Sequence, residues 1–253
     1  MNSSPDRDPL ITREILDPVA AYDRLAPHYS HFSNRRAAYL RTVEAQIQSR
    51  IPVGAQSLLD IGAGDGSRAL RIASAAKLSR VVLLEPSAGM SGAVAGRAEL
   101  WPIRCEDIQV STISQRFDVI TCLWNVLGHM PGSEKRIRAL KTAAALLSPE
   151  GILFIDVVHR YNLRSYGVVM TAARWFRDEL SQSETCGDVV AKWQTAGGEI
   201  RAYGHVFTDR EMRQLAHTAG LECVERIVID YETGKIRRTG CLGNLLYVLR
   251  RSS

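Results

Sequence analysis

A short apolar run that ends in a glycine-rich turn constrains the fold of this 253-residue chain more than any other feature. Residues 58–67 read Leu-Leu-Asp-Ile-Gly-Ala-Gly-Asp-Gly-Ser, and a helix-like stretch follows up to Ala75. The pattern predicts a buried strand, a tight turn and a helix. Because Gly62, Gly64 and Gly66 carry no side chains, a nucleoside-containing ligand can lie directly against the backbone of this turn.

Other segments of the chain repeat this alternation of strand and helix. Most of the expected strands are near-continuous apolar runs, which indicates a parallel sheet that helices cover on both faces. The polar stretch 232–243 separates the last two strands and predicts a closing antiparallel hairpin. We therefore expect an α/β fold with one mostly parallel sheet. The expected strands are residues 57–61, 81–84, 102–105, 117–123, 152–158, 221–229 and 244–250, and the clearest helices are residues 34–49 and 209–219.

The rhythm of the chain breaks after the fifth expected strand. Residues 159–206 hold a helix-like part at 166–180, a strand-like part at 188–193 and a glycine pair. We interpret this insertion as a lid that covers the substrate. Residues 1–15 are polar at their start and are expected to be disordered, and residues 16–253 are expected to form a single domain.

Composition narrows the classes of protein. The chain has five cysteines without the close spacing of a metal clip, which favours free thiols in a reducing cytoplasm and no metal site. We expect no membrane span, because the chain lacks an apolar run of about 18 residues. The net charge is +5, and its densest basic group is Lys135, Arg136, Arg138 and Lys141. We interpret this group as a solvated helix face rather than a nucleic-acid site.

The spacing of the turn glycines discriminates between nucleotide ligands. A dinucleotide site usually has the pattern G-x-G-x-x-G, whereas this turn has G-x-G-x-G. Asp60 and Asp65 beside the turn would repel a pyrophosphate, but they suit the amino group and sulfonium of S-adenosylmethionine. Glu85 ends the second strand 21 residues after Gly64, the separation expected of an acid that binds the ribose hydroxyls. An acid in the segment 105–108 could accept the adenine amino group while Ile108 packs on the ring.

With these motifs the chain resembles the class I S-adenosylmethionine-dependent methyltransferase family over about residues 20–251. The resemblance rests on residues 58–66, 84–90, 117–120 and 147–151. It implies a Rossmann-like sheet of seven strands whose last strand is reversed.

The resemblance also implies roles for individual residues. The turn that contains Asp60, Gly62, Gly64 and Gly66 would cradle the methionyl group, and a tyrosine and an arginine near the N-terminus would cover the cofactor and hold its carboxylate. The remaining residues would bind the ribose and the adenine. The residues assigned in this way to S-adenosylmethionine, and to S-adenosylhomocysteine as product, are Tyr29, Arg36, Asp60, Gly62, Gly64, Gly66, Glu85, Pro86, Met90, Asp107, Ile108 and Leu123.

The reacting end of the site is expected after the fourth strand. Methyl transfer needs a positioned nucleophile, the exclusion of water and, for some acceptors, a base, so a catalytic triad is not expected. Ligands of open α/β sheets bind beyond the carboxyl ends of the strands. Asn125 and His129 are therefore the candidate catalytic residues: Asn125 to bind the acceptor, and His129 as a base or a cofactor contact.

Several functions remain open at this point. Residues 123–129, 154–156 and 160–162 look like the glycine N-methyltransferase type, which predicts transfer to a nitrogen or oxygen of a small metabolite. Residues 22–30 and 134–140 look instead like tRNA wobble-uridine carboxymethyl methyltransferases. The glycine turn would also serve a non-catalytic module that binds S-adenosylmethionine or, with less suitable glycine spacing, a nicotinamide dehydrogenase.

Overall fold

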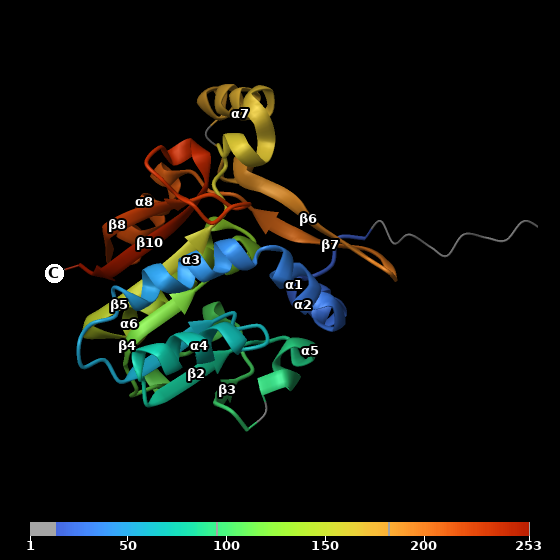
Figure 1. Ribbon diagram of the computed structural model, residues 1–253. Helices are drawn as coiled ribbons and strands as arrows, with labels where there is room; N and C mark the ends of the chain where they lie inside the picture. The colour runs from blue at the N-terminus through green and yellow to red at the C-terminus, as the bar shows by residue number, and fades with distance from the viewer. Residues whose placement is uncertain (1–13, 95, 182, 253) are drawn as a thin grey trace, which may run out of the picture.

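The computed structural model describes residues 14–252 except residues 95 and 182. Most of the segment expected to be disordered, residues 1–13, lies outside this range. The described residues form an eight-stranded sheet in the order β3-β2-β1-β4-β5-β10-β8-β9, with helices on both faces (Figure 1). Its strands are β1 (Ser57–Ile61), β2 (Arg80–Leu84), β3 (Glu99–Trp101), β4 (Phe117–Cys122), β5 (Leu147–Val157), β8 (Leu221–Ile229), β9 (Ile236–Arg237) and β10 (Asn244–Arg251).

The pairing of the strands confirms a mostly parallel sheet with a reversed last strand. The pairs β1·β2, β1·β4, β2·β3 and β4·β5 are parallel, whereas β10 runs antiparallel to both β5 and β8. The eighth strand, β9, is a two-residue pairing inside the stretch that was expected to be a loop.

The prediction of a third strand at 102–105 was wrong. The strand is β3, in which Trp101 is paired with Leu84. Pro102 follows and has no N–H to continue a ladder, and the chain turns into a short 3-10 helix at Cys105–Asp107. The helix expected at 34–49 is also divided, because the backbone leaves helical geometry at Arg36.

Two apolar layers enclose the sheet. On one face α6 (Ser133–Leu146) and α8 (Asp209–Thr218) bury Leu140 and Met212, and on the other α3 (Ala37–Gln48) and α4 (Ser67–Ala76) bury Ile47 and Ile72. Each helix presents its apolar residues at helical spacing to the sheet, which is how the buried strands are covered on both sides. One basic residue departs from the sequence interpretation: Arg136 of α6 is only 1% exposed rather than part of a solvated face.

The insertion after β5 forms α7 (Leu163–Leu180) and a separate two-stranded sheet of β6 (Asp188–Thr195) and β7 (Gly198–His205). The second of these strands was not anticipated. Ile200 and Ala202 of β7 pack against Ala21 and Leu25 of α1 (Pro18–Leu25) in a small apolar cluster of their own. Figure 1 shows the hairpin beside α1, away from the main sheet. The insertion therefore packs against the N-terminal helix α1.

Candidate active site

One pocket lies where β1, β2 and β4 end, bordered by α1, α2 (Tyr29–Arg35) and α5 (Ala88–Ser91). Its position at the carboxyl ends of parallel strands is the usual one for a ligand of an open α/β sheet. The pocket is lined by Pro18, Val19, Tyr22, Tyr29, Ile61, Gly62, Gly64, Arg68, Leu84, Glu85, Pro86, Met90, Arg104, Cys105, Glu106, Leu123, Trp124, Val126, His129 and Met130.

The glycine turn forms the floor of this pocket. Gly62, Gly64 and Gly66 all have left-handed backbones, with φ of 67°, 59° and 66°. Gly64 faces the open space, and a Cβ built there would lie 3.1 Å from Met90 Cε and 3.4 Å from the Tyr29 hydroxyl. Gly66 does not line the pocket, and it is required for packing because a Cβ there would lie 2.8 Å from the side chain of Leu83 on β2.

Glu85 is held in the pocket by the backbone. Its two carboxylate oxygens accept hydrogen bonds from the N–H groups of Gly64 and Ser87, both at 2.8 Å. Burial raises the pKa of this carboxyl group, and the two hydrogen bonds oppose that shift. Each oxygen keeps a second lone pair, so the carboxylate can still accept from a ligand hydroxyl.

Asp60 lies on β1 just before the turn, is buried, and does not line the pocket. Its Oδ1 accepts a 2.6 Å hydrogen bond from Thr121, whereas its Oδ2 has no partner among the described residues. Burial raises the pKa of Asp60, and the nearby Arg68 guanidinium opposes this. The two charges therefore stabilise one another in a buried layer under the glycine turn.

Arg68 was not among the residues predicted from the sequence. It lies in the first turn of α4, is 8% exposed, lines the pocket, and its Nε has no partner among the described atoms. A cation in the first turn of a helix opposes the helix dipole, and this was the available sequence signal for a tertiary role. Arg36, the arginine expected to meet a cofactor carboxylate, lies outside the pocket, where it pairs with Glu232 and stacks 4.4 Å over the ring of Tyr231.

At the end of the pocket expected to bind adenine, the acid that faces the pocket is not the predicted one. Pro86 and Met90 line the pocket as expected. Asp107 is exposed, and Ile108 packs against the sheet core instead of the pocket. Glu106 is buried and faces the pocket, because the 3-10 turn at Cys105–Asp107 brings it inward.

The two candidate catalytic residues are placed differently. The amide of Asn125 donates to the His205 carbonyl at 3.1 Å and accepts from Val158 N–H at 3.0 Å. Asn125 does not line the pocket; its side chain joins the loop after β4 to β7 and to the end of β5. Asn125 was expected to bind the acceptor, and the structure places its side chain outside this pocket.

His129 does line the pocket, and its partners set its tautomer. Nδ1 lies 2.9 Å from the carbonyl of Tyr203, which only accepts, so Nδ1 carries the hydrogen. Burial lowers the pKa of His129 and keeps the ring neutral, so Nε2 accepts from the Tyr22 hydroxyl at 3.1 Å. Trp193 of β6 contacts both rings, with centroids 5.7 Å from Tyr22 and 6.0 Å from His129. This end of the pocket is thus aromatic, half-buried and neutral.

Two further features are absent from the residues that the structure describes. They contain no cluster of three or more His, Cys, Asp or Glu side chains arranged to hold a metal ion. None of the helices that they form has the length and hydropathy needed to span a bilayer.

Comparison with known proteins identifies relatives of this arrangement. A family model described as a methyltransferase domain matches residues 22–226. The ubiquinone biosynthesis O-methyltransferase of Coxiella burnetii is 29% identical over 191 residues, which cover 73% of this chain and 71% of that protein. The dTDP-4-amino-2,3,4,6-tetradeoxy-D-glucose N,N-dimethyltransferase of Saccharopolyspora spinosa is 32% identical over 120 residues, or 47% of each chain.

A solved structure shares the fold. CalS10 with bound S-adenosylmethionine, an amino pentose methyltransferase from Micromonospora echinaspora, matches with a TM-score of 0.56 at 16% identity. The match covers 89% of this chain and 96% of that chain.

Proposed function

We propose that this chain, which belongs to the methyltransferase-domain family and is an S-adenosylmethionine-dependent methyltransferase, transfers the methyl group to a nitrogen or oxygen of a small molecule. One observation carries the proposal: the bare glycine turn, the Glu85 carboxylate and His129 all border one pocket. The names of the two relatives, an O-methyltransferase and an amino-sugar N,N-dimethyltransferase, support a small acceptor.

The residues of the pocket fit the cofactor. Gly64 has no side chain, and a Cβ there would occupy the space next to its backbone. That free space allows the methionyl group to lie directly on the backbone. The unpartnered Nε of buried Arg68 suits the carboxylate of that group, and Glu85 suits the ribose hydroxyls. When bound, S-adenosylmethionine supplies an electrophilic methyl group with a good leaving group.

Tyr22 and His129 can accept the proton that the acceptor loses. His129 Nε2 already accepts from the Tyr22 hydroxyl at 3.1 Å. If Tyr22 Oη takes a proton from the acceptor, its own proton passes to His129 Nε2, and the Tyr203 carbonyl on Nδ1–H stabilises the charged ring. The half-buried aromatic rings of Tyr22, His129 and Trp193 would limit the access of water to this step.

The insertion 159–206 is proposed to cover the acceptor. Its hairpin places Trp193 against Tyr22 and His129 at the reacting end of the pocket. The side of the acceptor opposite the cofactor would therefore lie against residues of the insertion.

The test has two steps. Mass spectrometry of the purified protein should detect S-adenosylhomocysteine, and a screen of amines, phenols and carboxylic acids should identify an acceptor whose turnover is insensitive to salt. Methylation of tRNA that falls steeply with salt would contradict a small acceptor. Binding of the cofactor without transfer to any of the three classes would indicate a binding module instead.

A further inference from the structure

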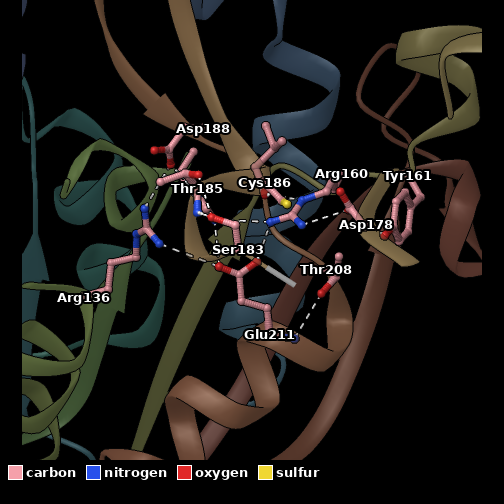
Figure 2. Close-up of polar contacts among 12 residues, drawn as sticks. Arg136, Arg160, Tyr161, Asp178, Ser183, Thr185, Cys186, Asp188, Thr208 and Glu211 are labelled. Carbon is pink, nitrogen blue, oxygen red and sulfur yellow. Dashed lines mark hydrogen bonds and ion pairs between the residues drawn. The ribbon is translucent and has the colours of Figure 1, made fainter. Parts of the chain in front are cut away.

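A cluster of charged side chains, in which three cations are buried and three carboxylates are partly exposed, lies beside β7. Figure 2 shows Glu211 between two arginines, with broken lines to both. The cluster brings together α6, α7, α8, both strands of the insertion and the segment after β5. Its charged members are Arg136, Arg160, Asp178, Asp188, His205 and Glu211.

The two arginines bind the carboxylates in pairs. Arg160 lies 2.8 Å from Glu211 and 3.0 Å from Asp178. Arg136 lies 3.7 Å from Glu211 and 3.7 Å from Asp188 (Figure 2). Because both guanidinium groups are almost fully buried, each needs this negative charge close by.

His205 completes the cluster as a bridge. The ring is 0% exposed, with Nδ1 2.7 Å from Asp188 and Nε2 2.7 Å from Glu211. A carboxylate only accepts hydrogen bonds, so the two short contacts favour a hydrogen on each ring nitrogen, and the longer contact of Nε2 with Arg160 Nη2, at 3.5 Å, opposes it. With His205 as an imidazolium, three buried cations face the three carboxylates, and the exposed Arg177 adds a fourth cation, 3.4 Å from Asp178.

The other side of β7 holds the pocket loop. The carbonyl of Tyr203 accepts from His129 Nδ1 at 2.9 Å, and the carbonyl of His205 accepts from Asn125 Nδ2 at 3.1 Å. The side chains of the same two β7 residues belong to the charge cluster: the Tyr203 hydroxyl donates to Asp188 and accepts from Arg136, both at 2.6 Å. The loop after β4 packs closely against β7, since a Cβ on Gly128 would lie 2.5 Å from the His205 carbonyl oxygen.

We propose that His205 is a positioning residue for methyl transfer. As an imidazolium clamped by Asp188 and Glu211, it fixes β7, and β7 then fixes the ring orientation and tautomer of His129. The proposal rests on the proposed function of His129, and it adds a residue that positions His129 without touching the acceptor. The charged cluster would then act in catalysis as well as in stability, because it positions the acceptor half of the site through the carbonyls of Tyr203 and His205.

The experiment is ¹⁵N NMR of histidine-labelled protein at pH 7. We expect both nitrogens of His205 to be protonated, and His129 to carry its proton on Nδ1. In His205→Gln the His129 resonances should shift, kcat should fall by about 10- to 100-fold, and the Kd for S-adenosylmethionine should change less than about twofold. His217→Gln, on the exposed face of α8, is the matched control and should alter none of these.

Asp188→Asn serves as a milder variant should His205→Gln fail to fold, because it keeps the shape of the side chain and removes one carboxylate. It should shift the His205 and His129 resonances together. A neutral His205 ring in the unmodified protein, or unchanged His129 resonances in a folded variant, would overturn the proposal. Calorimetry of S-adenosylmethionine binding to the unmodified protein tests the proposed function separately, because the NMR readout does not depend on it.

Discussion

The two halves of the pocket are built in different ways. In the cofactor half, the key hydrogen bond joins Gly64 and Glu85, which are 21 residues apart and follow the ends of two neighbouring parallel strands, β1 and β2. In the acceptor half, Tyr22 meets His129 across 107 residues, and His129 meets β7 across a further 74. The first half follows from one strand–turn–helix unit and the next strand. The second depends on the insertion folding back onto the N-terminal helix, which suggests that the acceptor half is the more easily altered without loss of the cofactor site.

The largest expected effect is on the cofactor half. Gly64→Arg should abolish binding of S-adenosylmethionine, because the backbone there is left-handed and the new side chain would fill the space between Met90 and Tyr29. Isothermal titration calorimetry measures the loss. Gly197→Arg at the hairpin turn, where a Cβ meets nothing closer than 3.8 Å, is the control and should bind normally. Retained affinity in Gly64→Arg would place the cofactor elsewhere.

Glu85→Ala should have the next largest effect. Loss of charge-assisted hydrogen bonds to the ribose should cost about 1.5–3 kcal/mol, or roughly a 10- to 150-fold weaker Kd. Glu134→Ala, a fully solvated acid on α6, should leave the Kd unchanged. An unaltered Kd in Glu85→Ala would show that the ribose is bound by other groups.

Arg68→Met separates the two ends of the cofactor. Affinity for S-adenosylmethionine should fall by about 10-fold, whereas affinity for 5′-methylthioadenosine, which has no carboxylate, should stay the same. Competition calorimetry with both compounds measures the difference. Arg71→Met on the same helix, whose partner is Glu44, is the control. Equal losses for the two ligands would mean that Arg68 only supports the fold.

The smallest effect concerns the acceptor half and its pH dependence. Burial lowers the pKa of His129 in the folded state, so its contribution to stability is complete above its ordinary value of about 6.5 and is lost as pH falls below that. Urea unfolding from pH 7.5 to 5.5 should therefore show a steeper loss of stability with falling pH in the unmodified protein than in His129→Phe. His129→Phe should reduce this slope by up to about 1.4 kcal/mol per pH unit. His159, whose pKa burial lowers to about 4, contributes in the same direction and remains in both proteins. An unchanged slope would mean that His129 is not held neutral by burial.

The local sequence was sufficient to predict the positions of several residues in the cofactor half of the pocket. Gly62, Gly64 and Glu85 are placed by the boundaries of two buried strands, and apolar runs and turn residues predict such boundaries well. The polar stretch 232–243 also predicted the antiparallel pairing of the last two long strands, which β8 and β10 show. The third strand was misplaced by three residues because it is short and Pro102 follows it.

The choice between neighbouring side chains required the tertiary structure. Glu106 instead of Asp107 faces the pocket because a single 3-10 turn decides which acid points inward. Arg68 instead of Arg36 reaches the pocket because Glu232 and Tyr231, almost 200 residues further along the chain, bind Arg36. The sequence by itself thus determined the fold, the glycine turn and its acid, since these depend on neighbours in the chain. The tertiary structure alone decided the directions of Arg68, Asn125 and His129, because their partners come from distant segments that only folding brings together.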